Sequence, residues 1–330
     1  MKATLPSIAV LALAVASAAS VACASGYTDE NLHDFCSRAN CTDGRYPSAA
    51  LVRDASGELF GTADRGGQAN SGVVFELVPD AGSYKFYVIH NFGDGDGLAN
   101  PDGGHILEKN GRLYGTASGG GTNNRGAVFR LSYAGAGWTL AVLHNFGGAD
   151  GEVPEAGLAY AGQSSGRQWD ESSPLFGTAN AGGIYGNGVA YELAHSGSTW
   201  TETVIHNFKD SRDPDGLLED AAGNLWGANS DGGKYGGGLM YRLARGTWKQ
   251  TVVHNFCEAQ NCSDGSAPGG VCTWTLPETC SVQPSLADPA AQVSPVAGLS
   301  SNAPPAVRTK CYTIFARAST AATVHRRMRA

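Results

Sequence analysis

A short motif, His-(Asn/Asp)-Phe, contains five of the eight histidines of the sequence: His33, His90, His144, His206 and His254. An imidazole can serve as a general base or as a metal ligand, so its recurrence invites both interpretations. An active site is usually singular, however, whereas this histidine returns in every copy of a longer pattern. We therefore favour a structural role, in which the His or Asn side chain hydrogen-bonds the Asp-Gly turn that follows it.

Pairs of aspartates two residues apart precede a glycine in two stretches, DGDG and DPDG. This spacing occurs in loops that bind hard cations through oxygen ligands. One interpretation is therefore calcium binding by Asp94, Asp96, Asp213 and Asp215. The favoured alternative is a plain Asp-Gly turn, because no glutamate follows at the twelfth position as an EF-hand requires. No cofactor other than calcium is indicated.

Two other kinds of site find less support. The Gly-rich loops lack the GKS or GKT ending of a phosphate-binding loop, and H-E-x-x-H does not occur. Aromatic side chains could line a carbohydrate groove, but most of them precede or occupy expected strands, where packing is the default role. These aromatic residues are Trp138, Trp200, Trp226, Trp248 and Tyr114.

The same succession of elements recurs between consecutive copies of the motif, which are 57, 54, 62 and 48 residues apart. An Asp-Gly turn comes first, at Asp43-Gly44, Asp96-Gly97, Asp150-Gly151, Asp215-Gly216 and Asp264-Gly265. A short apolar run, LFGT or a close variant, a Gly-Gly pair and an alternating run then lead to the next motif. The longest interval contains an insertion, residues 162–174, which we expect on a surface loop.

The apolar runs are short, rich in Val, Leu, Tyr and Phe, and bounded by Gly, Asp or Asn, which are strand signals. A period of about 50 residues with four short strands fits a propeller blade whose faces are covered by its neighbours. We expect an all-β, β-propeller-like array of four-stranded repeats. Its four complete units fall at about 51–92, 105–146, 157–208 and 217–256, and a larger propeller could have been truncated. The leading strand, Leu32–Phe35, could close the ring by pairing with the last blade.

The pattern DG-x-P-x-x-x-L-x-x-x-x-G-x-LYGT-x-x-x-GG-x-G-x-VF-x-L resembles the bacterial tandem repeats called GloVer repeats. The resemblance covers residues 32–271, with several spaced elements recurring together. It implies an exported protein with a repeat scaffold and varied means of anchoring. It assigns no biochemical role and supplies no catalytic residues.

The N-terminus has the pattern of a secretory signal peptide: basic Lys2, an apolar run, and small residues before a cleavage site after Ala24. Residues 1–24 are therefore expected to be removed, and residues 25–271 to form the repeat domain. A lipoprotein anchored at Cys23 is the alternative, but Ser20 stands where a large aliphatic residue is preferred. No later segment reaches the roughly 20 apolar residues of a transmembrane helix.

Two Cys pairs with the same C-x4-C spacing, Cys36/Cys41 and Cys257/Cys262, favour short disulfides in an exported chain. The formal net charge is −7 and only 16% of residues are charged, which argues against nucleic acid or an anionic membrane as partner. The expected location is secreted, periplasmic or at the cell surface.

Residues 272–330 contain a single glycine, Gly298, and no repeat element. They are either a disordered tail or the product of out-of-frame translation. Suitable synonymous codons for residues 272–284, read from the third base, spell YLDAAGNLFGTT, which is the next expected repeat element. The same procedure on residues 310–322 spells VLYDFCQGVNCR, which resembles the stretch around Cys36.

We expect a binding or surface scaffold rather than an enzyme, with a glycan or a cell-surface protein as the partner. The alternative is a carbohydrate-active enzyme or lactonase with a site on one propeller face. An enzyme should place unmatched carboxylates or histidines in the loops of one blade, and the sequence shows mainly repeated ones.

The out-of-frame hypothesis makes a prediction about the gene. The codons used for residues 272–330 should spell repeat elements in the shifted frame, and sequencing the gene checks this. Codons that spell no repeat element in that frame would leave a natural tail as the explanation.

Overall fold

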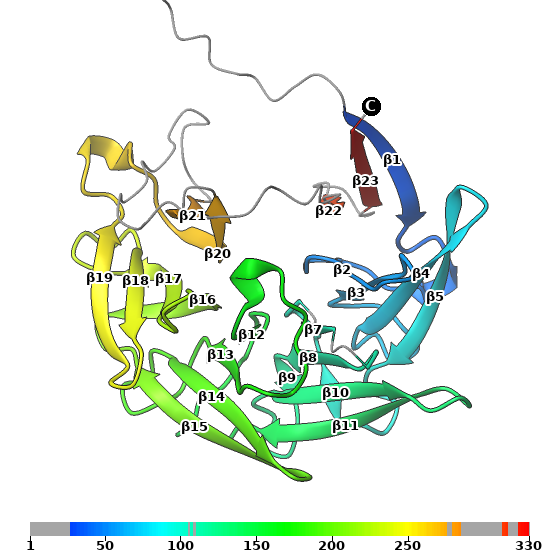
Figure 1. The fold of residues 1–330 in the computed structure, drawn as a ribbon, viewed down its shortest axis with the longest axis horizontal. Coiled ribbons are helices and arrows are strands. Elements are labelled where there is room, and N and C mark those ends of the chain that lie inside the picture. Colours follow the sequence, from blue (N-terminus) through cyan, green and yellow to red (C-terminus); the bar gives the residue numbers. More distant parts are fainter. Residues whose placement is uncertain are drawn as a thin grey trace, which may run out of the picture.

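Four sheets of four antiparallel strands form the main part of the computed structural model (Figure 1). The structure describes residues 27–104, 106–107, 110–275, 279–284, 312–315 and 323–329. These residues contain no α-helix, only the short 3-10 turns η1 (Ala39–Cys41), η2 (Gln163–Ser165) and η3 (Gln260–Cys262). The predicted all-β, propeller-like fold is confirmed.

Within each sheet, or blade, the strands lie side by side in chain order. The first blade consists of β2 (Val52–Arg53), β3 (Leu59–Ala63), β4 (Val73–Asp80) and β5 (Ser83–Asn91). The second consists of β7 (Ile106–Leu107), β8 (Leu113–Ala117), β10 (Ala127–Tyr133) and β11 (Trp138–Asn145). The third consists of β12 (Ala159–Tyr160), β13 (Leu175–Ala179), β14 (Val189–Ser196) and β15 (Thr199–Asn207). The fourth consists of β16 (Ser211–Glu219), β17 (Leu225–Gly232), β18 (Leu239–Ala244) and β19 (Lys249–Asn255).

The blades follow one another around an arc, with the first strand of each blade on the inside and the last on the outside (Figure 1). Two short strands, β6 (Leu98–Ala99) and β9 (Gly119–Gly120), pair at the second blade. The pair β20 (Pro268–Thr275) and β21 (Thr279–Pro284) follows the fourth blade, and β20 contacts β16 and β17. A further sheet contains β1 (Tyr27–Asp34), β23 (Thr323–Arg329) and β22 (Tyr312–Phe315).

The LFGT strands are buried on both faces because they lie between neighbouring blades. All five residues of β3, β8 and β13 are buried. The glycine in each of these strands leaves room for the aromatic ring of the next strand. A Cβ at Gly61 would stand 2.6 Å from the ring of Phe75, which explains why the element needs glycine there.

The phenylalanine of each His-(Asn/Asp)-Phe motif is buried in the core, and Phe92, Phe146 and Phe208 insert between two consecutive blades. All five phenylalanines are at most 1% exposed: Phe35, Phe92, Phe146, Phe208 and Phe256. Each of the first four meets an aromatic ring of the following blade edge to face, with centroids 5.1 to 5.2 Å apart. Those partner rings belong to Phe75, Phe129, Tyr191 and Tyr241.

The leading strand does not pair with the last blade, contrary to one of our expectations. Strand β1 pairs with β23, from Tyr27↔Arg329 to Asp34↔Thr323. The fourth blade is a complete sheet of four strands of its own, β16 to β19, so it does not need β1 as a member. Strand β1 packs instead against the first blade, where the His33 ring stacks on Phe86.

The insertion at residues 162–174 is not merely a surface loop, which is a second correction. Its Trp169 is 1% exposed and packs edge to face on Tyr114 of the second blade, with ring centroids 4.8 Å apart. The indole Nε1 donates a hydrogen bond to the carbonyl of Ser173. Burial of so large an apolar side chain is favourable enough to draw the insertion onto the blades.

The expected signal peptide and most of the expected tail lie outside the described residues. The described parts of the tail are strands β21, β22, β23 and the end of β20. Both predicted disulfides are present, Cys36–Cys41 around η1 and Cys257–Cys262 around η3. Among the described residues, no helix has the length and hydropathy to cross a membrane.

The inserted phenylalanine should dominate the stability of each blade junction. Phe146→Ala leaves a cavity between the second and third blades, and we expect it to lower the free energy of unfolding by about 3–5 kcal/mol in urea titrations. Ile184→Ala, at a side chain that is 72% exposed, is the control and should change it by less than about 0.5 kcal/mol. Equal effects of the two substitutions would contradict this role.

Candidate functional site

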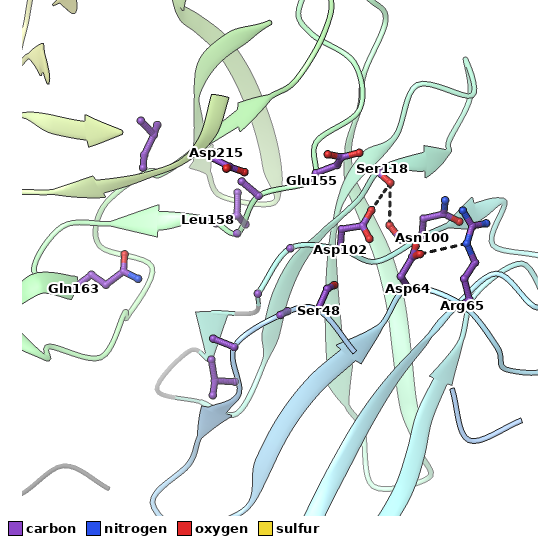
Figure 2. Close-up of a pocket in the computed structure, with 18 residues that line it drawn as sticks. Ser48, Asp64, Arg65, Asn100, Asp102, Ser118, Glu155, Leu158, Gln163 and Asp215 are labelled. Atoms are coloured by element: carbon purple, nitrogen blue, oxygen red, sulfur yellow. Dashed lines mark hydrogen bonds and ion pairs between the residues drawn. The ribbon is translucent and has the colours of Figure 1, made fainter. Parts of the chain in front are cut away.

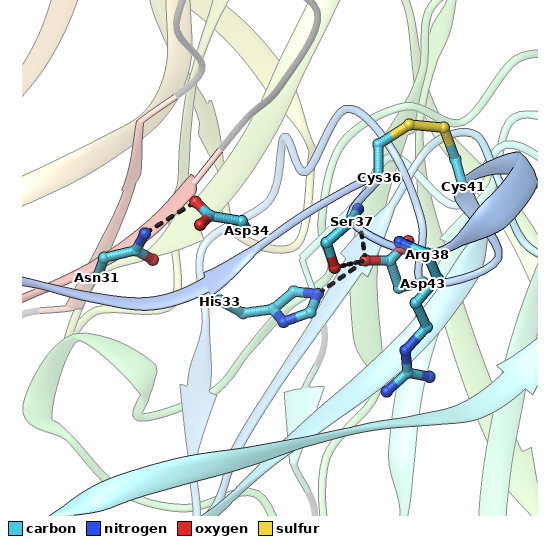
Figure 3. A network of polar contacts seen from close by, with 8 residues as sticks. All are labelled: Asn31, His33, Asp34, Cys36, Ser37, Arg38, Cys41 and Asp43. Carbon is cyan, nitrogen blue, oxygen red and sulfur yellow. Dashed lines mark hydrogen bonds and ion pairs between the residues drawn. A yellow bond between two sulfur atoms is a disulfide. The ribbon is translucent and has the colours of Figure 1, made fainter.

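The repeated histidines lie one at each blade junction rather than together. His33 Nε2 is 3.2 Å from Asp43 Oδ2, and the same pair recurs at the next junctions (Figure 3). The corresponding distances are 2.7 Å for His90–Asp96, 2.9 Å for His144–Asp150 and 3.4 Å for His254–Asp264. The geometry makes each pair a connector between a strand end and the turn that follows it.

The asparagine of the motif caps the Gly-Gly turn of its own blade. Its side-chain oxygen accepts a hydrogen bond from a backbone N–H of that turn, at 2.9 to 3.0 Å, in all four blades. These oxygens belong to Asn91, Asn145, Asn207 and Asn255.

At the first junction, burial tends to raise the pKa of Asp43, but hydrogen bonds from Ser37 and Arg38 hold it below its ordinary value.

The junction after the third blade departs from the others. Only Lys209 and Asp210 separate Phe208 from β16, and His206 Nε2 has no hydrogen-bond partner among the described residues, Asp210 included. Burial lowers the pKa of His206. Our alignment of Asp215-Gly216 with the Asp-Gly turns is therefore wrong. The backbone gives the correct register, because the residue before each repeat proline has positive φ: Tyr46, Asn100, Val153, Asp213 and Ala267.

When the repeats are aligned on this proline, the residues that follow it occupy equivalent positions. These residues are Ser48, Asp102, Glu155, Asp215 and Gly269. The first four line a central hollow of about 790 Å³, formed where the inner strands and the segments before them converge (Figure 2). Asp64, from the end of β3, joins them. Gln163 of the insertion also lines the hollow.

Neighbouring side chains fix two of these carboxyl groups. Ser118 Oγ donates to Asp102 Oδ2 at 2.5 Å, and Asn180 Nδ2 donates to Glu155 Oε2 at 2.7 Å. Ser118 and Asn180 follow the LFGT elements of their own blades, the position that Asp64 has in the first blade. Each of these two blades thus supplies a carboxyl group together with its hydrogen-bond donor.

The hollow accumulates negative charge. Burial is the main cause that raises the pKa of Asp102, to about 7, and the Asp64 and Glu155 carboxylates add to it. Burial and the aspartates of β16 likewise raise the pKa of Glu155. Arg65 is the one cationic side chain among the described lining residues, and its Nε lies 3.2 Å from Asp64 Oδ2. Such a site can bind cations, hydrogen-bond hydroxyl groups or exchange protons near neutral pH.

The four residues considered for calcium do not form one group. Asp96, in the turn after β5, accepts hydrogen bonds from the N–H groups of Gly93 and Leu98, and Asp94 in the same turn is exposed. Asp213 and Asp215 lie on β16 in the fourth blade, and only Asp215 of the four lines the central hollow. Calcium binding at either pair stays a prediction.

Sequence reasoning missed Asp64, Asp102 and Glu155. The proline of each repeat could have revealed two of them, because aligning the repeats on Pro101, Pro154 and Pro214 brings Asp102, Glu155 and Asp215 to the same position.

The sequence also contains GQSSG, residues 162–166, which matches the letters of a nucleophile elbow. It forms the 3-10 turn η2 between β12 and β13, and not the strand-to-helix turn of that motif.

Comparison with known families matches residues 21–169 to the Gloeobacter/Verrucomicrobia repeat. Residues 21–169 therefore carry Gloeobacter/Verrucomicrobia repeats. No curated protein matches this chain.

Similar solved structures include a gluconolactonase from Xanthomonas campestris, with 13% identity and a TM-score of 0.43 over 71% of this chain and 68% of that one. A variant of AofleA from Arthrobotrys oligospora has 12% identity and a TM-score of 0.47, over 73% of this chain and 66% of that one. A family 117 glycoside hydrolase from Zobellia galactanivorans has 11% identity and a TM-score of 0.42, over 74% and 78%.

The raised pKa of Asp102 predicts how stability depends on pH. The group titrates at about 7 in the folded chain and at 3.8 ordinarily, so between these values the folded state binds more protons than the unfolded state. Its contribution to stability is therefore present below about pH 4 and lost as the pH rises to about 7.

In Asp102→Asn, thermal unfolding measured from pH 4 to 8 should show a smaller decline of Tm with pH than in wild type. Asp80→Asn, at an exposed ion pair with Lys85, is the control and should keep the wild-type slope. A slope in Asp102→Asn equal to that of wild type would mean that this group titrates normally.

Proposed function

We propose that this repeat protein is an exported binding scaffold that takes a small ligand in its central hollow. The observation that carries the proposal is that three consecutive blades place a carboxyl group at the same position, Asp102, Glu155 and Asp215, around one open space. The hydrophobic and His-(Asn/Asp)-Phe positions are nearly uniform between blades, whereas this series varies from Ser48 to Gly269. Variation at one position of a uniform scaffold is typical of a binding surface. The two disulfides favour an oxidising compartment.

The charge of the hollow favours a ligand that carries a positive charge, such as an amine or an amino-bearing saccharide. Four carboxyl groups face a single arginine there, and Arg65 is already paired with Asp64. The buried Oδ1 of Asp64 has no hydrogen-bond partner among the described residues. An ammonium group would satisfy this oxygen and relieve the repulsion between carboxylates. The described lining contains no aromatic ring on which a neutral sugar could stack.

An array of neutral, acidic and amino-bearing glycans, together with simple di- and polyamines, tests this proposal with the full chain. We expect the amine-bearing ligands to bind, with affinity that falls as salt rises. In calorimetry, Glu155→Gln and Asp215→Asn should each weaken the binding at least tenfold. The control Glu258→Gln, at an exposed residue that Tyr235 contacts, should not change it. Preference for acidic glycans, or binding unchanged by both substitutions, would refute the proposal.

A second candidate function, hydrolysis of a glycosidic or lactone bond, is favoured by one observation. Asp102 is protonated up to about pH 7 and lies beside the Asp64 carboxylate, so the two could act as acid and base. A panel of glycosides and lactones tests this, with Asp102→Asn as the variant. Turnover that disappears in the variant would support hydrolysis, and no turnover across the panel leaves binding as the function.

A further inference from the structure

The junction between the second and third blades contains a carboxylate that the other junctions lack. Glu202 lies on β15, opposite Leu193 of β14. The strand pairing places equivalent residues in the other blades, each opposite the corresponding leucine: Phe86, Leu140 and Gln250. In the first junction that residue, Phe86, stacks on the ring of His33 with centroids 3.7 Å apart. A carboxylate therefore stands where the scaffold otherwise places an uncharged side chain against the histidine.

Glu202 approaches the His–Asp pair of the preceding blade. His144 ends β11, Asp150 lies in the turn after it, and His144 Nε2 is 2.9 Å from Asp150 Oδ2. Ligand atoms of His144, Asp150 and Glu202 all lie within 4.8 Å of one another. Among the described residues, this is the one group of three or more His, Cys, Asp and Glu side chains that converges so closely.

The cluster contains a buried polar atom that lacks a hydrogen-bond partner. Glu202 Oε1 is enclosed by protein atoms and has no hydrogen-bond partner among the described residues. The Glu202 and Asp150 carboxylates lie beside one imidazole in a half-buried position, where two like charges repel each other unless a proton or a cation lies between them.

We propose that His144, Asp150 and Glu202 form a divalent transition-metal site, best suited to Zn²⁺, that joins the second and third blades. An imidazole nitrogen with two carboxylate oxygens suits zinc, whereas calcium and magnesium prefer oxygen ligands alone. Three protein ligands leave a fourth position for water. Binding would draw Glu202 inward, because ligand atoms around a tetrahedral zinc ion stand about 3.4 Å apart.

Neighbouring groups already orient two of the three ligands. The backbone N–H of Gly147 donates to Asp150 Oδ1 at 2.7 Å, which leaves Oδ2 directed at the cluster. The His144 ring meets Phe146 edge to face, with centroids 4.9 Å apart. Supporting contacts of this kind are what hold metal ligands in place. Among the described residues, His33, His90 and His254 have an aspartate partner without a third ligand, and His206 lacks the aspartate partner. The site is therefore specific to this junction.

Zinc titration of the full chain tests the proposal. The protein should carry no histidine tag, its free thiols should be alkylated with the disulfides intact, and bound metal should be removed with EDTA. We expect calorimetry at pH 7.5 to show one equivalent of Zn²⁺ bound and thermal unfolding to shift upward with zinc. In Glu202→Gln the affinity should fall at least tenfold and the thermal shift should disappear. Glu202→Leu should give the same result. Leucine already occupies the equivalent position of the second blade, Leu140, so this variant is expected to fold.

Two controls separate this site from other carboxylates. Glu192→Gln removes a carboxylate from the adjacent strand β14, and Glu155→Gln removes one from the central hollow. Both variants should bind zinc as wild type does. The proposal is wrong if the wild-type chain binds no zinc, if Glu202→Gln and Glu202→Leu bind it normally, or if Glu155→Gln abolishes the binding.

Discussion

The contact between a buried phenylalanine and an aromatic ring of the next blade is the interaction on which the other features depend. A four-stranded sheet of this kind has two apolar faces and cannot bury both alone. Phe146 and its counterparts fill the space between consecutive sheets, and the neighbouring positions of the motif hold them there. The histidine reaches the following turn and the asparagine caps the Gly-Gly turn, so one tripeptide fixes both sides of a junction.

A scaffold fixed in this way leaves a few positions free to differ between blades, and the two proposed binding sites are built from residues at those positions. The residue after the repeat proline faces the central hollow, and its change from Ser48 to Asp102, Glu155 and Asp215 makes that hollow acidic. The residue that faces the histidine at each junction also differs between blades, because Glu202 replaces an uncharged residue at one junction only. Both sites arise from substitutions in a repeat and not from added structure.

Sequence reasoning predicted the strands, the repeat and the two disulfides, because these follow from local patterns of apolar residues, glycines and cysteines. It misaligned one repeat. The turn after Phe208 is shortened, and the Asp-Gly letters at Asp215 drew the alignment to the wrong place. The positive φ before each proline, which corrects it, is a backbone property that no letter reports. The burial of Trp169 and the approach of Glu202 to His144 depend on contacts between blades, which sequence spacing alone does not give.

The most direct test of this account is a double-mutant cycle between Phe146 and Tyr191, whose rings meet across the second and third blades. The free energies of unfolding of Phe146→Leu, Tyr191→Leu, the double variant and wild type give the coupling between the two side chains. If inserted aromatic rings join the blades, the coupling should be about 0.5–1.5 kcal/mol. Additive effects, with a coupling below about 0.3 kcal/mol, would show that the blades are held together by something else.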